Sequence, residues 1–290
     1  VLEHHSNLTP EHQTWREKVL SENWDAPVVF TTMVPFLEAL FGGGTRGARR
    51  MHQLANSVLI FDEIQTLPVR CVHIFNNAVN FLVEQCGSSV VLCTATQPLL
   101  HSVFQGRGAL RLSPNHELMT DRKPLFDDLR RVEVIDRRQG EGFTYEAIFQ
   151  LAIGEMKREG SCLVVVNTKE AARSIFEYAT DLAPDERIHL STSMCPAHRK
   201  VELAKIRKRL DLGLPTLCVS TQLIEAGVDI DFRVVIRSLA GLDSIAQAAG
   251  RCNRNGRPQK GTLHLVKARE EKLGRLPEIT KAGEASERVL

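Results

Sequence analysis

Several features common in other proteins are missing from this 290-residue sequence. Its seven cysteines include no Cys-x-x-Cys pair. An odd, scattered set within apolar segments is typical of buried thiols, so we expect a cytoplasmic protein. No apolar run approaches the roughly 18 residues of a membrane span and no signal peptide is visible, so no membrane association is expected. Two Trp and two Tyr are too few for long aromatic stacking ladders along a nucleic acid.

The sequence also lacks an excess of charge of either sign, because the formal net charge is only +2. A nucleic-acid partner is neither required nor excluded by this balance, and any polyanion site must come from a local cluster. The composition, 43% hydrophobic and 25% charged, is that of an ordinary globular protein. The length predicts two domains or one large one.

Short apolar runs alternate with helical patterns along most of the chain, which predicts an α/β protein with mainly parallel sheets. One helix is expected to begin at Asn167, as an N-cap with Glu170 three residues later. Another is expected from Pro196 to just before Gly213. The predicted strands are residues 28–32, 58–61, 90–93, 132–135, 162–166, 188–190, 216–219, 234–236 and 263–266. Ligands of such sheets bind beyond the carboxyl ends of the strands.

Two of these strands end in polar residues that suggest chemistry. Asp62 and Glu63 follow the strand 58–61, which we expect to be buried. One carboxylate can hold Mg²⁺ and the other can orient or deprotonate water, although a helix N-cap would also explain the pair. Thr94 and Thr96 follow a second strand expected to be buried, and either relay hydrogen bonds or cap a helix that contains Pro98.

Two segments in the second half of the chain offer groups for binding phosphate. Residues 220–231 combine hydroxyl and amide donors with a tight glycine loop, although a surface turn would look the same. Residues 247–254 place Arg251 and Arg254 three positions apart, which predicts one helical face, with Gln247 one turn earlier. Arginine pairs of this kind stabilise charge on a transferring γ-phosphoryl group.

In sequence order, Asp62-Glu63-Ile64-Gln65, Thr94-Ala95-Thr96, residues 220–231 and residues 247–254 resemble the motif series of superfamily 2 helicases. Residues 24–32, 55–58, 65–68 and 222–229 more specifically resemble the CRISPR-associated helicase–nuclease of type I interference. The resemblance extends from about Ala26 to about Gly261. It implies two RecA-like lobes with ATP between them, DNA as the track, and a guide-RNA surveillance complex as the recruiting partner.

The resemblance also implies roles for individual residues. Asp62 and Glu63 would act on Mg²⁺ and the attacking water, with Gln65 replacing the His of many members, and Thr94 and Thr96 would couple hydrolysis to strand movement. In the second lobe, Arg254 is the preferred arginine finger. The other residues expected at the nucleotide or DNA are Thr221, Gln222, Glu225, Gly227, Asp229, Gln247 and Arg251.

The sequence departs from the family in two respects. It has no Gly-x-x-x-x-Gly-Lys-Ser/Thr phosphate loop, since the glycines from Gly42 to Gly47 are not followed by Lys-Ser/Thr. It also lacks the family's His-Asp nuclease motif. We therefore expect an incomplete first lobe, and a chain that is part of a larger polypeptide or pairs with one supplying the missing strands. Arg46, Arg49 and Arg50 are interpreted as a mobile basic loop that touches a DNA backbone or is simply solvated.

The expected organisation is a partial first lobe over residues 1–125, a second lobe over residues 126–268, and a charged tail or linker over residues 269–290. The leading hypothesis is an ATP-dependent DNA helicase region, inactive alone without the phosphate loop. The alternatives are a DNA-binding or adaptor fragment that does not hydrolyse ATP, and an RNA helicase of the same superfamily.

Overall fold

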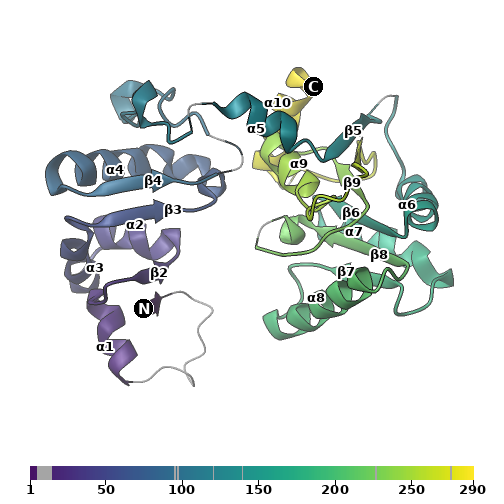
Figure 1. Cartoon of the computed structure of the whole chain (residues 1–290), viewed down its shortest axis with the longest axis horizontal. Coiled ribbons are helices and arrows are strands. Elements are labelled where there is room, and N and C mark those ends of the chain that lie inside the picture. Colours follow the sequence, from purple (N-terminus) through teal and green to yellow (C-terminus); the bar gives the residue numbers. More distant parts are fainter. Residues whose placement is uncertain are drawn as a thin grey trace. The chain divides into compact units, whose positions relative to one another are not determined.

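A computed structural model of the chain describes residues 1–4, 15–94, 96, 98–119, 121–138, 140–225, 227–274 and 276–290. The chain divides into two compact units, Val1–Thr120 and Asp121–Leu290, and each is described by itself. Figure 1 labels most of the helices and strands of each unit. None of the helices within these ranges combines the length and apolar character needed to cross a membrane.

The first unit contains two small parallel sheets and four α-helices within the described ranges. One sheet pairs β1 (Leu2–His4) with β2 (Val29–Thr31), and the other pairs β3 (Val58–Phe61) with β4 (Ser89–Leu92). The helices are α1 (Trp15–Asn23), α2 (Met33–Phe41), α3 (Thr45–Met51) and α4 (Val72–Cys86). Their shared core includes Phe36, Phe61 and Phe75, whose rings pack edge to face.

The strand before the acidic pair is not buried, contrary to the sequence prediction. Val58 and Ile60 on β3 are 69% and 67% exposed, whereas Leu59 and Phe61 pack against the core. Alternate residues of a strand face opposite sides of the sheet, and only one side of this two-stranded sheet is covered. Strand β4 is likewise no better than half-buried. This uncovered apolar face agrees with the expectation that the first lobe is incomplete.

The second unit is built around one six-stranded parallel sheet with the strand order β5-β10-β9-β6-β8-β7. The strands are β5 (Val132–Asp136), β6 (Ser161–Val166), β7 (Arg187–Leu190), β8 (Thr216–Thr221), β9 (Val234–Ser238) and β10 (Gly261–Val266). The helices are α5 (Arg122–Asp128), α6 (Tyr145–Glu159), α7 (Lys169–Glu177), α8 (Pro196–Asp211), α9 (Leu242–Ala249) and α10 (Pro277–Val289).

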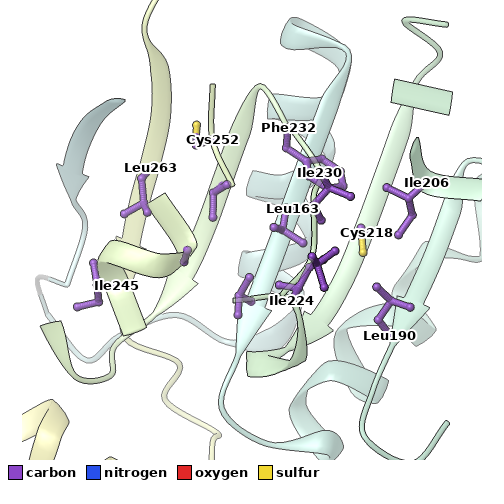
Figure 2. Packing of buried hydrophobic residues seen from close by; sticks show 14 of the residues in the cluster. Leu163, Leu190, Ile206, Cys218, Ile224, Ile230, Phe232, Ile245, Cys252 and Leu263 are labelled. Carbon is purple, nitrogen blue, oxygen red and sulfur yellow. The ribbon is translucent and has the colours of Figure 1, made fainter. Parts of the chain in front are cut away.

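Both faces of this sheet are covered, which explains why its central strands read as continuous apolar runs. Helices α6 and α7 contribute Ile148 and Ile175 to the core on one face. Helices α8 and α9 contribute Ile206 and Ile245 to the core on the other face, together with Phe232 (Figure 2). The prediction of an α/β protein with mainly parallel sheets is confirmed.

The nine predicted strands all form, with ends within two residues of those expected, and β1 is the one further strand in the described part of the chain. The predicted cap of α7 was wrong by one residue. The side chain of Thr168, not Asn167, accepts the hydrogen bond from the Ala171 N–H. Asn167 instead points inward, where its Nδ2 donates to the Leu239 carbonyl at 2.9 Å. Helix α8 begins with Pro196 as predicted.

Candidate functional site

The acidic pair lies at the carboxyl end of β3, on the surface of the first unit. Asp62 and Glu63 are both exposed, and the Glu63 backbone has a left-handed φ of 53° that non-glycine residues seldom adopt. Asp62 Oδ1 accepts a hydrogen bond from the Glu63 N–H at 3.0 Å. Neither carboxylate caps the short 3₁₀ helix Ile64–Thr66 that follows. The helix-cap alternative therefore does not explain these two residues.

A hydrogen-bonded chain connects the acidic pair to the end of the neighbouring strand β4. Gln65 Nε2 donates to Glu63 Oε2, and Gln65 Oε1 accepts from the Thr94 hydroxyl. The Thr94 Oγ1 also accepts from the Thr96 N–H at 3.1 Å. No helix begins at Pro98, which leaves the cap alternative for the two threonines without support. Parallel pairing of β3 with β4 brings these groups together, because it places both carboxyl ends at one edge.

No cluster of three or more metal-binding side chains occurs in the described part of the chain, so these residues alone do not form a cage for a cation. Mg²⁺ does not require one, since it is commonly held by one or two carboxylates together with water and substrate phosphates. The exposed Asp62 carboxylate has no ion-pair partner among the described residues, and its oxygens are the ligand type that Mg²⁺ prefers. The donor set therefore fits a Mg²⁺ ion delivered with a nucleotide.

The two arginines predicted to share a helical face do not do so. Helix α9 ends at Ala249, and both side chains leave from the turns beyond it. Arg251 is 6% exposed and donates to the carbonyls of Ile224 and Glu225 at 2.9 and 2.6 Å. The exposed Arg254 pairs with Asp229 at 2.8 Å. The first arginine is thus held in the interior, and the second is presented at the surface.

Glu225 is also an interior residue, although its sequence context predicted a place at the nucleotide. Its Oε1 lies 2.9 Å from Nε of the fully buried Arg237, as an ion pair without hydrogen-bond alignment. Its Oε2 accepts from the Ser244 hydroxyl at 2.6 Å. Burial raises the pKa of the Glu225 carboxyl, and the positive charge of Arg237 opposes that shift. This network fixes the loop after β8 to strand β9 and to the start of α9.

Sequence reasoning missed Arg237 altogether. A signal was present, because Arg237 is a charged residue that directly follows the apolar residues 234–236 of its strand. A buried charge in such a strand requires a partner.

The remaining predicted residues of this region lie around the same loop. Gly227 has a φ of 68°, the left-handed conformation that suits glycine and that a tight loop requires. Gln222 and Gln247 are half-buried, whereas Thr221 is only 5% exposed. Gln222 after β8 and Gln247 on α9 thus offer half-buried amide side chains, while the Thr221 hydroxyl lies inside.

The predicted mobile basic loop is in fact helix α3. Arg49 pairs with Glu22 at 3.2 Å, and Arg50 donates to the Ser21 carbonyl at 3.2 Å. The Arg50 guanidinium also lies 5.5 Å from the centre of the Trp24 ring. The side chain of Arg46 lies outside the described structure. These contacts hold two of the three arginines against α1 and the Trp24 that follows it.

Comparison with known proteins gives a consistent result. Residues 158–257 match the family model described as the C-terminal part of the CRISPR-associated nuclease/helicase Cas3. A Cas3 nuclease/helicase of Haloferax volcanii is 25% identical over 320 residues, an alignment that covers 81% of this chain and 34% of the relative. The chain therefore spans about a third of that relative's length.

Two solved structures share the fold. The T. fusca Cas3 structure with AMPPNP has a TM-score of 0.63 at 18% identity, covering 85% of this chain and 34% of that one. A structure described as a CRISPR RNA-guided surveillance complex before nicking has a TM-score of 0.61 at 19% identity, covering 87% and 36%. The match to the family model and to the Haloferax volcanii relative confirms the resemblance to a CRISPR-associated superfamily 2 helicase seen in the motifs. The two solved structures confirm a fold of RecA-like lobes.

Proposed function

We propose that this chain is the helicase region of a type I CRISPR effector, which couples ATP hydrolysis to movement along single-stranded DNA and to duplex unwinding. The observation that carries the proposal is the exposed Asp62–Glu63 pair, connected through Gln65 to Thr94. A carboxylate pair at the end of a parallel strand, joined to a second strand end, is suited to sense and transmit the state of a bound phosphate. The family match and the fold agree with this assignment.

In this proposal Asp62 holds Mg²⁺, and Glu63 orients or deprotonates the attacking water. Bound Mg²⁺ would neutralise charge on the β- and γ-phosphates. Gln65 holds the Glu63 carboxylate in place through its amide N–H. A movement of the Glu63 carboxylate would be passed to Thr94 and Thr96 through the Gln65 side chain. This transmission is the coupling role proposed for the two threonines.

Arg254 is the proposed arginine finger, since it is exposed. Its ion pair with the exposed Asp229 contributes little free energy, so a phosphate group could replace Asp229 as its partner. Arg251 and Glu225 support it from inside, because they hold the backbone at residues 224–225. Gln222 and Gln247 are proposed to contact the nucleotide, with Gly227 shaping the loop. Contacts to the DNA backbone are proposed for the basic helix carrying Arg46, Arg49 and Arg50. The Thr221 hydroxyl is buried, so the DNA contact expected for it is not retained.

The phosphate loop has to come from elsewhere, because this sequence contains none. We propose that ATP turnover requires a polypeptide that supplies that loop, and that the whole protein works in the cytoplasm with a guide-RNA surveillance complex. Without the loop, the β- and γ-phosphates lack their main anchor. This absence favours a second candidate function for the chain by itself, a DNA-binding or adaptor fragment that does not hydrolyse ATP.

An ATPase assay with single-stranded DNA tests the proposal, on this chain alone and on the chain joined to a segment with a phosphate loop. In the completed protein, Glu63→Gln is expected to lower turnover at least about 100-fold, because a general base is lost, while nucleotide binding persists. Glu38→Gln, at an exposed glutamate of the same unit, is the control and should leave turnover unchanged.

Each result decides between the candidates. Unchanged turnover in Glu63→Gln contradicts the role assigned to this residue. DNA binding without turnover in the completed protein favours the adaptor function. Turnover stimulated by RNA and not by DNA would identify an RNA helicase instead.

A further inference from the structure

A small cavity in the second unit is lined mainly by basic and amide side chains that the proposed function does not use. It measures about 40 Å³ and adjoins the amino ends of β9 and β10. Arg233, Arg257 and Lys260 line it, together with Glu159. A volume of this size holds roughly three water molecules, or one small ion in their place.

The cations of this cavity have unused hydrogen-bonding capacity. The half-buried Arg233 has no side-chain partner among the residues that the structure describes, and neither does the exposed Lys260. Arg257 pairs with Asp231 through Nη2 at 3.1 Å. Its Nη1 is buried and has no hydrogen-bond partner within the described ranges. An acceptor placed in the cavity would therefore meet the unpartnered side chains of Arg233 and Lys260.

Negative charge at the cavity is already partly neutralised. The carboxylate of Glu159 accepts from Arg158 Nε at 3.0 Å, and Asp231 receives both Arg257 and the backbone N–H of Arg254. Arg257 is therefore offset by Asp231 and Glu159 by Arg158, which leaves Arg233 and Lys260 as cations without a carboxylate partner among the described residues. The balance at the cavity favours an anion.

The wall of the cavity is held in a fixed shape before any ligand binds. Asn253 is 2% exposed, has a left-handed φ of 50°, and places Nδ2 within 3.0–3.2 Å of the carbonyls of Arg131, Arg257 and Gln259. Its Oδ1 accepts from the Arg257 N–H at 2.7 Å. At Gly261 a Cβ atom would lie 2.4 Å from the Cys252 sulfur, so only glycine fits there. A site fixed in this way loses little conformational entropy on binding.

We propose that this cavity binds a phosphate group. The guanidinium groups of Arg233 and Arg257 match phosphate oxygens in geometry, and Lys260 adds a third positive charge at the mouth. The group is either free inorganic phosphate or the phosphate of a nucleic acid. The inference does not depend on ATP hydrolysis or on any role of Asp62 and Arg254, because neither residue lines the cavity.

Titration of the whole chain with inorganic phosphate, followed by calorimetry and by thermal unfolding, tests the proposal. Sodium chloride at equal ionic strength is the reference. We expect saturable binding that Arg233→Gln and Lys260→Gln each weaken about tenfold, the effect of losing one charge-assisted hydrogen bond. The matched control is Lys208→Gln, at an exposed lysine of α8 away from the cavity, which should bind as the wild type does.

Lys260 is exposed and has no side-chain partner within the described ranges, so Lys260→Gln is expected to fold normally. This variant still tests the proposal if Arg233→Gln does not fold. Competition by a 5′-phosphorylated oligothymidylate, but not by its unphosphorylated form, identifies a terminal phosphate as the ligand. Equal competition by both identifies a backbone diester. Absence of saturable binding overturns the proposal, and so does equal stabilisation of the wild type and both variants, which would be a general salt effect.

Discussion

The buried pair of Arg237 and Glu225 gives the sharpest prediction for the stability of the second unit. Replacing Arg237 with Met leaves the Glu225 carboxylate, 6% exposed, without its cation. It also removes the donors to the Ser238 carbonyl at 2.6 Å and to the Ser244 hydroxyl at 2.9 Å. Breaking a buried pair from one side typically costs about 3–5 kcal/mol. We expect Arg237→Met to lower the free energy of unfolding of this unit by about that amount.

The double variant Arg237→Met/Glu225→Gln should recover part of the loss, because no uncompensated charge stays in the interior. Arg173→Met is the control, since the Arg173–Glu177 pair is exposed and is expected to contribute about 0.5 kcal/mol or less.

The loss in Arg237→Met should depend on pH in a defined direction. Burial raises the pKa of the Glu225 carboxyl in the wild type, and Arg237 limits the rise, so removing Arg237 raises it further. A carboxyl group whose pKa is higher in the folded than in the unfolded state destabilises the fold least at a pH below its unfolded-state pKa. The loss of folding free energy develops as the pH rises through the folded-state pKa of the group. The defect should therefore be smaller at about pH 5 than at about pH 8.

The chain contains convenient probes for this measurement. Its two tryptophans, Trp15 and Trp24, lie in the first unit, and its two tyrosines, Tyr145 and Tyr178, lie in the second. In a urea titration, the transition seen by tryptophan fluorescence should be unchanged by Arg237→Met, while the transition seen by tyrosine absorbance shifts to lower urea. A loss below about 1 kcal/mol, or a loss that does not change with pH, would refute this reasoning about the buried pair.

Three further predictions concern the same unit. Thr168→Ala should cost about 1 kcal/mol in a urea titration, because α7 loses its N-cap acceptor; no change would mean that this bond contributes nothing. Glu271→Gln should speed hydrogen exchange at the Asn167 and Thr168 amides, which donate to this carboxylate at 2.7 and 2.8 Å, and unchanged exchange would contradict this. Burial lowers the pKa of His264 in the folded state. The free energy of unfolding should therefore fall as the pH drops below about 6.5, the pKa of histidine in the unfolded state. Thermal unfolding should show a smaller fall in His264→Gln.

The residues themselves determined most of the secondary structure of this protein. The continuous apolar run 162–166 forms a strand as predicted, and its unbroken apolar character fits a sheet that is covered on both faces. Pro196 begins its helix because its fixed φ and missing N–H suit the first turn. The order of polar strand ends, from Asp62 to Arg254, was by itself enough to indicate the helicase resemblance.

Tertiary structure decided which polar groups are available for chemistry. Arg251 and Arg254 look equivalent in sequence, yet one is anchored to the carbonyls of residues 224 and 225 and the other is exposed. Glu225 and Arg237 are twelve positions apart, and only the packing of the β8 loop against β9 makes them a pair. Sequence patterns report local periodicity, whereas burial and pairing of charges depend on neighbours that are distant along the chain, and those neighbours exist only once the sheet has formed.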